Sequence, residues 1–215
     1  MLKHKYFAAF AALVLVAGAF SVPASASGAA AGMISVGTFL NVRSAGNTGA
    51  GVIGRLYDGA QVTVVGSVNG WDEITYSGKA GWVAGQYVLT GKIRTAVMAA
   101  ESQLGVPYRY GAESAGQAFD CSGLTKYAYG KAGVGLPHSA KDQAGFGWTV
   151  SRNTLRPGDL LFFDPHDSGT ISHCGIYIGY SMFISAQSGA GKVMKANLTS
   201  AYWSGAFVTA RRLAG

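Results

Sequence analysis

The sequence predicts an α+β protein in which a small all-β barrel precedes a larger domain of helices and an antiparallel sheet. Three observations predict this class. Between residues 33 and 90, short apolar runs are separated by Gly and Asn turn signals. After residue 91, apolar residues recur at helical spacing, and β-type runs return only after Pro157 and Gly158. Helices that precede a run of strands, instead of alternating with them, indicate an α+β fold.

Residues 1–26 have the order of a secretory signal peptide, in which positive charge precedes an apolar run and small residues follow it. Lys3 and Lys5 supply the charge, and the segment ends in small residues up to Ala26. The apolar run is shorter than the roughly 20 residues that span a bilayer. We therefore expect cleavage, no stable membrane insertion of the mature chain, a secreted location, and a disordered leader at 27–32. A retained N-terminal anchor is the alternative.

The composition excludes some partners and leaves others open. The formal net charge is +7, without a long block of Lys or Arg, so nucleic-acid binding is not predicted. A modest positive charge would suit an anionic polymer such as a bacterial wall, or would serve only solubility. Cys121 and Cys174 are the only cysteines in the sequence. In an exported protein, one disulfide between them is the default expectation.

The first domain, residues 33–90, is expected to contain only strands and turns. Turn signals such as Asn69-Gly70 and Ser77-Gly78 recur every several residues, as in a small antiparallel barrel. The phrases LNVRSAG and GWV, near the start and the end of this stretch, resemble a bacterial SH3-like domain. That resemblance implies a wall-binding module, and a spacer that only packs on its neighbour is the alternative. The expected strands cover residues 38–42, 52–56, 61–68, 71–76 and 80–84.

The second domain, residues 92–215, is expected to begin with helices and to end with a meander of strands. Apolar residues at helical spacing predict a helix that ends at Gly105. A second helix is expected from Cys121 to about Lys131, with Asp120 as its N-cap. The expected strands cover residues 159–163, 172–179, 182–186, 193–196 and 206–212.

Cys121 is the candidate nucleophile. At the first position of a helix, its sulfur would lie near unpaired backbone N–H groups, which favour the thiolate. Asp120 opposes this effect, because a neighbouring carboxylate disfavours a second negative charge. A cationic partner is therefore expected, and His173, at the start of the segment HCGIYIG, is the obvious candidate for the general base.

Such a pair is suited to papain-type chemistry. The imidazole takes the thiol proton, the thiolate attacks an amide carbonyl, and the imidazolium protonates the leaving amine. A third group is expected to orient the ring.

The alternation of side chains along the strand of His173 bears on the second cysteine. His173, Gly175 and Tyr177 share one face, and Cys174 lies on the other. If His173 points at Cys121, then Cys174 points away from it into the core. A disulfide between the two cysteines would require the strand to turn over. The pattern therefore favours two free thiols.

A metal site is an alternative use of some of these residues. Asp164, His166, Asp167 and His173 offer oxygen and imidazole ligands at close spacing, which would suit zinc. The string Asp-Pro-His-Asp-Ser-Gly is, however, typical of a turn between two strands. The turn is the favoured interpretation.

Six phrases occur in order from about residue 93 to residue 213: GVPYRYG, FDCSGL, LPHSAKDQ, LRPGDLLFF, SHCGIYIG and YWSGAFVTARRL. They resemble the NlpC family of bacterial cell-wall cysteine endopeptidases. The resemblance implies a papain-like fold, Cys121 as nucleophile, His173 as base, and no metal or organic cofactor. It also implies a secreted peptidoglycan hydrolase that acts on stem peptides, most often between γ-D-glutamate and the following diamino acid.

The resemblance further implies three substrate-binding residues. Tyr110, Asp120 and Ser122 lie where members of the family line the cleft and meet the free amino end of a short peptide. A core aromatic and a helix cap are the alternatives for Tyr110 and Asp120. The family's third catalytic residue is commonly a His twelve positions beyond the base, where this sequence has Ser185. Ser185, or Gln187 on the same face of its strand, is expected to accept the ring N–H.

Two other functions are compatible with the same residues. The chain could be a non-catalytic wall-binding protein whose second domain is degenerate at Ser185. It could also be an amidase or acyltransferase that uses the same Cys and His, because one fold can host several acyl transfers.

Overall fold

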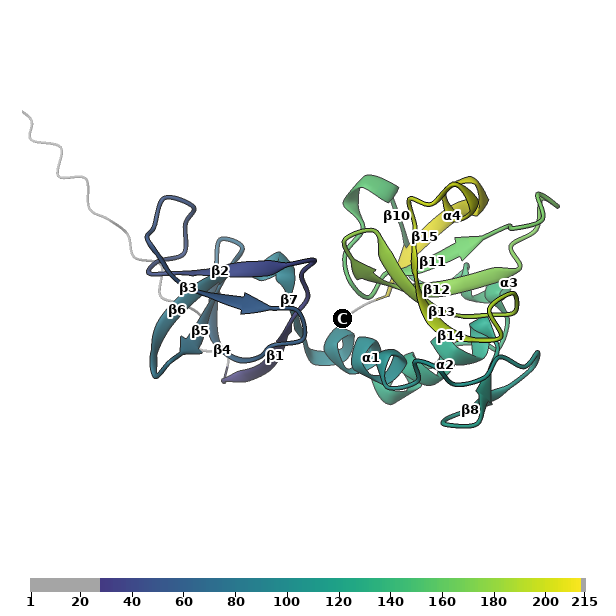
Figure 1. The fold of residues 1–215 in the computed structure, drawn as a ribbon, viewed down its shortest axis with the longest axis horizontal. Helices are drawn as coiled ribbons and strands as arrows, with labels where there is room; N and C mark the ends of the chain where they lie inside the picture. The colour runs from purple at the N-terminus through teal and green to yellow at the C-terminus, as the bar shows by residue number, and fades with distance from the viewer. Residues whose placement is uncertain (1–27, 214–215) are drawn as a thin grey trace, which may run out of the picture.

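The computed structural model describes residues 28–213, so the expected signal peptide at 1–26 lies outside the described residues. Figure 1 shows two units along the chain: an all-β unit, drawn in purple to blue, and a larger unit in which helices pack against a sheet. In the described part of the chain, no helix is both long and apolar enough to cross a membrane. The fold class is therefore the expected α+β, with the all-β unit first.

The all-β unit is one antiparallel sheet of seven strands with the order β3-β2-β6-β5-β4-β1-β7. The turns Asn69-Gly70 and Ser77-Gly78 have positive φ at both residues, as two-residue hairpin turns require. The residues Ile34, Val36, Leu40, Val42, Val64, Ile74 and Val83 form its core. Its strands are β1 (Ala30–Ile34), β2 (Phe39–Arg43), β3 (Val52–Tyr57), β4 (Gln61–Val68), β5 (Trp71–Tyr76), β6 (Lys79–Ala84) and β7 (Val88–Thr90).

The prediction of a disordered leader at 27–32 is wrong for its last three residues. Ala30 to Gly32 begin β1, which pairs with β4 and with β7. The Gly/Ala composition suggested disorder, but small side chains are what this position accommodates. A Cβ on Gly32 would lie 2.9 Å from Cγ1 of Val88 and 3.0 Å from Cγ2 of Val62. The first sheet therefore begins before residue 33.

Helix α1 (Gly91–Glu101) follows β7 directly and joins the two units (Figure 1). It ends earlier than the expected Gly105. The N–H groups of Gln103 and Leu104 bond to carbonyls three residues back, which tightens the chain into a 3₁₀-type turn. Gly105 itself has a φ of +87° and ends the turn.

The second unit is built on an antiparallel sheet of six strands with the order β10-β15-β11-β12-β13-β14. The sequence predicted helix α2 and strands β11 to β15 to within one residue, but it did not predict α3, α4, β8, β9, β10 or the 3₁₀ turn η2. These elements are too short for apolar periodicity to show. The strands are β10 (Trp148–Val150), β11 (Leu160–Phe163), β12 (His173–Gly179), β13 (Met182–Gln187), β14 (Lys192–Asn197) and β15 (Phe207–Arg212), and β8 (Glu113–Ser114) pairs separately with β9 (Ala118–Phe119). The helices are α2 (Cys121–Lys131), α3 (Ala140–Gln143) and α4 (Ala201–Ala206), with the 3₁₀ turn η2 (Arg152–Thr154); a further 3₁₀ turn, η1 (Gly85–Tyr87), lies between β6 and β7 of the all-β unit.

The two faces of this sheet have different coverings. Helices α1 and α2 cover one face, where Phe162, Cys174 and Ile176 belong to the main core together with Leu124 of α2. The opposite face carries a second cluster, which includes Phe163, Phe183 and Ala206. Trp203 of α4 packs against this cluster. Figure 1 shows α4 and α2 on different sides of the sheet. Neighbouring residues of one strand therefore meet different surroundings.

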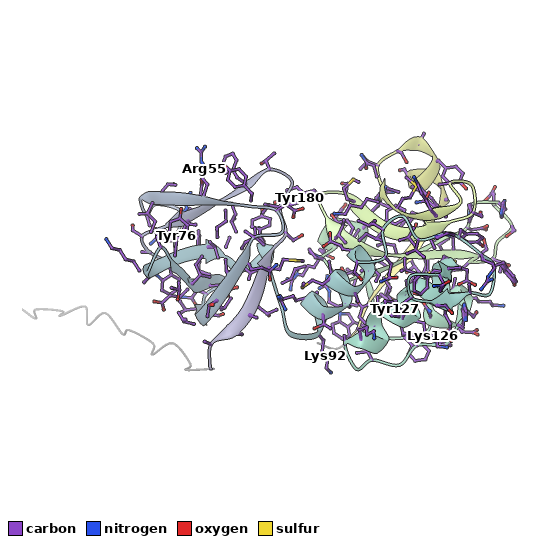
Figure 2. The ribbon with its side chains drawn as sticks, turned by 60° about the horizontal axis from the view of Figure 1, so that its bottom comes forward. Arg55, Tyr76, Lys92, Lys126, Tyr127 and Tyr180 are labelled. Carbon is purple, nitrogen blue, oxygen red and sulfur yellow. The ribbon has the colours of Figure 1, made fainter. Side chains whose placement is uncertain are left out.

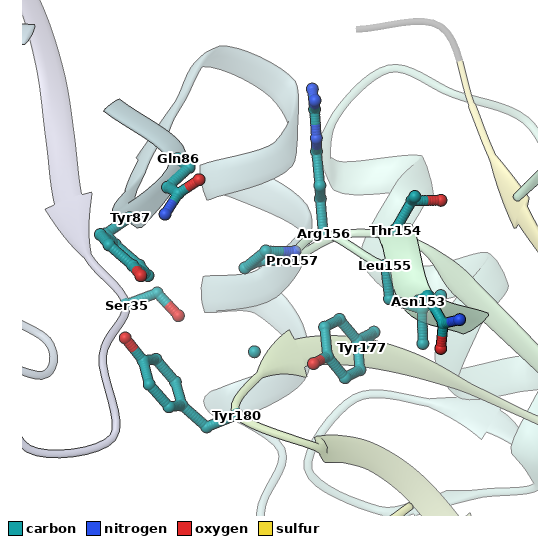
Figure 3. Close-up of a pocket in the computed structure, with 11 residues that line it drawn as sticks. Ser35, Gln86, Tyr87, Asn153, Thr154, Leu155, Arg156, Pro157, Tyr177 and Tyr180 are labelled. Atoms are coloured by element: carbon teal, nitrogen blue, oxygen red, sulfur yellow. The ribbon is translucent and has the colours of Figure 1, made fainter. Parts of the chain in front are cut away.

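The all-β unit contacts the β12–β13 hairpin of the second unit. The Oγ of Ser35 donates a hydrogen bond to the carbonyl of Ile178 over 2.7 Å, and the rings of Tyr87 and Tyr180 stack with centroids 6.1 Å apart. Figure 2 shows Tyr180 at this junction, and Figure 3 shows Tyr87 and Tyr180 with Tyr177 and Arg156 around a cavity of about 390 Å³. The junction lies at the end of β12 opposite to His173.

Candidate active site

Cys121 is the first residue of α2, as predicted, and Asp120 is the N-cap. The Oδ1 of Asp120 accepts a hydrogen bond from the backbone N–H of Gly123 over 2.7 Å, which fixes the start of the helix. Gly123 is required at this position, because a Cβ there would lie 2.2 Å from the carbonyl oxygen of Ala112. The helix start therefore holds the sulfur of Cys121 at the positive end of the helix dipole.

The structure brings Cys121 next to the start of β12, where His173 lies. The Sγ of Cys121 lies 3.9 Å from the carbonyl oxygen of Ser172, the residue that precedes His173. The thiol is 8% exposed and lines an open cleft of about 430 Å³. Of the predicted site residues, Tyr110, Asp120, Cys121 and Ser122 line the cleft; His173 does not, but the two residues before it, Ile171 and Ser172, do.

The surroundings of Cys121 favour its thiolate. Its pKa is lowered to about 4, first by hydrogen bonding with the thiol of Cys174; burial opposes the shift, and the hydrogen bond and charge of His173 add to it. The pKa of Cys174 is raised, first by burial and then by its neighbour Cys121. These shifts favour the thiolate at Cys121 and the neutral thiol at Cys174.

Both cysteines are free, as the strand pattern predicted. The prediction that Cys174 points away from Cys121 is wrong. Cys174 faces the helices, and because α2 packs on that face, the two thiols belong to the same core cluster. The alternation along the strand was correct, but it did not say on which side α2 would pack.

A buried polar network lies beneath the nucleophile, and the sequence did not single it out. The hydroxyl of Thr125 donates to Oε1 of Gln143 over 2.6 Å, and Nε2 of Gln143 donates to the carbonyls of Ser122 and Pro137 over 3.0 and 2.7 Å. The Sγ of Cys174 lies 3.7 Å from the same Oε1. These contacts tie α3 to the first turn of α2. The only sequence signal was the position of Gln143 at the end of the phrase LPHSAKDQ.

Asp120 is a helix cap, one of the two roles that the sequence left open, and it also lines the cleft, where substrate binding stays a prediction. Besides capping α2, its carboxylate accepts hydrogen bonds from the backbone N–H of Gly111 over 2.8 Å and from the hydroxyl of Ser122 over 3.2 Å. It also lies 2.9 Å from Nε2 of His138, whose Nδ1 is 3.1 Å from Glu113. His138, which sequence reasoning missed, thereby links the buried carboxylate to a surface one at the edge of the cleft.

Tyr110 is not a core aromatic. Its side chain is 88% exposed, and it lines the cleft. Ser122, by contrast, is buried, and its hydroxyl is turned toward Asp120.

The expected hydrogen bond from His173 to Ser185 or Gln187 is absent. The Nε2 of His173 is buried and has no hydrogen-bond partner among the described residues. Gln187 donates instead to the hydroxyl of Ser185 over 3.1 Å. Ser185 lies opposite Gly175, because a Cβ added to Gly175 would be 3.1 Å from the Cβ of Ser185. Gly175 is two residues beyond His173 in β12, so Ser185 is not directly opposite the imidazole. Aromatic rings surround the imidazole instead: Trp203 is stacked on it with centroids 5.0 Å apart.

The loop after β11 has the geometry of a turn. The carboxylate of Asp164 accepts hydrogen bonds from Ser168 and Thr170, and Asp167 has a φ of +50°. Within residues 28–213, no three His, Cys, Asp or Glu side chains are grouped as a metal site would require. Asp164, His166, Asp167 and His173 therefore do not form the zinc site that was considered.

Replacing Asp120 with Ala is expected to lower the free energy of unfolding by about 2 to 4 kcal/mol, because a helix cap and several buried donors lose their acceptor together. Urea unfolding followed by circular dichroism measures this. Asp142→Ala is the matched control: this carboxylate is in the first turn of α3 and exposed, so its loss should change stability by less than about 0.5 kcal/mol. Equal effects in the two variants would contradict a structural role for Asp120.

Comparison with known proteins identifies two matching families. The NlpC/P60 family matches residues 105–212, and the bacterial SH3 domain matches residues 38–88. Among curated relatives, the chain is 39% identical over 120 residues to a gamma-DL-glutamyl hydrolase of Bacillus subtilis (strain 168) and 35% identical over 114 residues to the murein DD-endopeptidase MepH of Escherichia coli (strain K12). These matches cover 55% and 52% of this chain but only 29% and 42% of the relatives' lengths.

Two solved structures share the fold. An NLP/P60 family protein similar to a lipoprotein, from Staphylococcus aureus, has a TM-score of 0.53 at 29% identity, and the match covers 65% of this chain and 52% of that one. NlpC1 of Trichomonas vaginalis has a TM-score of 0.51 at 24% identity and covers 84% of this chain and 68% of that one, which shows the fold alone.

Proposed function

The chain belongs to the NlpC/P60 family, and from this membership we propose that it is a secreted cysteine endopeptidase that hydrolyses the stem peptides of bacterial peptidoglycan. One observation carries the proposal: the thiol of Cys121 lies at a helix N-terminus, in an open cleft, with a pKa lowered by Cys174 and by the imidazole of His173. A thiolate with an adjacent imidazolium is the resting state from which papain-type hydrolysis starts.

The reaction then follows from these two groups. The thiolate of Cys121 attacks the carbonyl carbon of the peptide bond and forms a tetrahedral intermediate. As the C–N bond breaks, the imidazolium of His173 gives its proton to the leaving amine, and a thioester remains on Cys121. The neutral imidazole then takes a proton from water, and the resulting hydroxide attacks the thioester carbonyl carbon. The C–S bond breaks, and the acid product leaves with the thiolate and the imidazolium restored.

The proposed scissile bond joins γ-D-glutamate to the following diamino acid. The name of the Bacillus subtilis relative, a gamma-DL-glutamyl hydrolase, supports this assignment. The cleft offers a matching subsite: the carboxylate of Asp120 lines it together with Ser122, and a carboxylate is suited to the ammonium group of a free amino end. The exposed ring of Tyr110 is the proposed contact at the rim.

The first domain is proposed to hold the enzyme on the wall. Its match to the bacterial SH3 domain supports this role, and the positive net charge of the chain suits an anionic polymer. The secreted location rests on the expected signal peptide at residues 1–26.

A second candidate function is a non-catalytic wall-binding protein. The observation that favours it is the lack of a hydrogen-bond acceptor for Nε2 of His173 among the described residues. An imidazole without a fixed orientation would make a poor base.

Digestion of purified peptidoglycan tests both candidates. Walls that contain lysine and walls that contain diaminopimelate are incubated with the protein, and the soluble products are identified by mass spectrometry. We expect fragments that end in γ-D-glutamate, together with fragments that begin with the diamino acid. Release of L-alanine-terminated peptides from muramic acid would instead indicate an amidase, and no release from either wall would support the binding protein.

A further inference from the structure

The imidazole of His173 makes aromatic contacts, but its Nε2 makes no hydrogen bond to the described residues. This atom is buried without a partner among residues 28–213. The ring stacks on Trp203 with an interplanar angle of 28° and centroids 5.0 Å apart, and it meets the ring of Phe163 at 48° and 5.9 Å. Trp203 is therefore the side chain that presents its face to the base.

Trp203 is itself held rigidly. Three rings meet the indole edge-on. The distances between ring centroids and the interplanar angles are 4.9 Å and 63° for Phe163, 5.2 Å and 88° for Phe183, and 4.8 Å and 80° for Tyr202. Ser200 caps the helix by accepting from the backbone N–H of Trp203. A ring packed in this way cannot turn without disturbing the second core cluster.

Arg152 fixes the short helix that carries Trp203. Its guanidinium donates to the carbonyl of Leu198 over 3.0 Å, to the hydroxyl of Ser204 over 3.1 Å and to the carbonyl of Ser204 over 3.4 Å. It also lies 5.2 Å from the centroid of Phe207. Helix α4 has only six residues and would be marginal alone, so the three hydrogen bonds of Arg152 help to place Trp203.

We propose that Trp203 is the positioning residue for the catalytic base, in the role that a third polar residue would otherwise have. Stacking restricts rotation of the imidazole about its terminal torsion, which is intrinsically broad. The negative face of the indole also stabilises the positive charge of the imidazolium that pairs with the Cys121 thiolate, and Trp is the side chain best suited to this cation–π contact. The proposal rests on the proposed function of the Cys121–His173 pair.

The other candidates on this face of the sheet make no hydrogen bond to Nε2 of His173. Ser185 and Gln187 are hydrogen-bonded to each other. Phe163 is tilted to the imidazole and lies farther away than Trp203. Stacking by Trp203 therefore accounts for an imidazole that has a defined place without an acceptor for its Nε2.

The test compares Trp203→Leu, Trp203→Phe and the control Phe207→Leu. Phe207 belongs to the same cluster and is half-buried like Trp203, and its ring contacts Phe163 and Arg152 but not His173. Each variant is assayed on soluble L-alanyl-γ-D-glutamyl-diamino acid peptide for kcat and KM. Each is also treated with iodoacetamide, which reports the reactivity of Cys121 without requiring hydrolysis, and its melting temperature is measured.

Trp203→Leu is expected to lower kcat about tenfold with KM within twofold, and to slow alkylation of Cys121 below about pH 5, where its thiolate begins to be protonated, whereas Trp203→Phe should recover most of both. Phe207→Leu should lower the melting temperature while changing kcat by less than about threefold. The proposal is overturned if Trp203→Leu leaves kcat and alkylation unchanged, if Phe is no better than Leu at position 203, or if Phe207→Leu causes the same loss of kcat. A wild-type protein that hydrolyses nothing would refute the proposed function, and the alkylation rates would still decide the role of Trp203.

Discussion

Replacing Cys121 with Ala is expected to reduce the release of peptide from purified peptidoglycan by at least about 10³-fold. Removing the nucleophile of a covalent mechanism removes the step on which the other residues act, and losses of this size or larger are usual. The measurement is mass spectrometry of soluble fragments against time, with the wild-type protein at the same concentration. Cys121→Ala removes only the sulfur from a helix position that Asp120 continues to cap, so the fold should persist.

Two controls separate loss of chemistry from loss of structure. The Cys121→Ala variant should sediment with insoluble wall as the wild type does, since the first domain is unchanged. Cys174→Ala removes the other thiol, which is buried in the same core cluster, and should retain measurable hydrolysis. Undiminished release by Cys121→Ala would show that the hydrolysis does not depend on this thiol. Complete loss of hydrolysis in Cys174→Ala, with none in Cys121→Ala, would show that Cys174 and not Cys121 is the nucleophile.

Alkylation of Cys121 by iodoacetamide is expected to proceed at a nearly constant rate from pH 5 to pH 8. A thiol with a pKa lowered to about 4 is already a thiolate throughout this range, and its reaction should slow only as the pH falls through about 4. A free cysteine, with a pKa of about 8.5, should instead react about tenfold faster for each unit of pH over most of the same range. Peptide mapping of the alkylated protein gives the rate for each cysteine.

Cys174 is the internal control for this experiment. Burial raises its pKa and closes it to reagent, so it should stay unmodified in the folded protein and react after unfolding in urea. In His173→Ala, the alkylation profile of Cys121 should move to higher pH, because one of the groups that stabilises the thiolate is lost. A Cys121 rate that rises tenfold per pH unit from pH 5 to pH 8 in the wild type would contradict an activated thiolate.

Local signals in the sequence located the main elements. Hairpin turns with Gly in the second position marked the strands of the first sheet, and Asp120 marked the start of α2. Helix α4 could not be found in this way. Its six residues, AYWSGA, have two aromatic side chains and a glycine, and its place depends on Arg152, about 50 residues earlier in the chain.

The first sheet also shows how composition can mislead. Ala30 to Gly32 have the composition of a flexible leader, yet they pair on both sides with other strands. Pairing uses backbone groups that every residue carries, so small side chains do not prevent it. Here the close approach of Val62 and Val88 requires Gly32.

By itself, the sequence determined that Cys121 begins a helix and that His173 begins a strand, because capping and side-chain alternation depend on residues next to one another in the chain. Only the tertiary structure decided that Cys174 lies on the same side as Cys121, that Gln143 ties α3 to α2 beneath the nucleophile, and that Trp203 rather than Ser185 meets the imidazole. These contacts join segments far apart in the sequence. They depend on which face of a sheet a helix packs against, and no local rule fixes that choice.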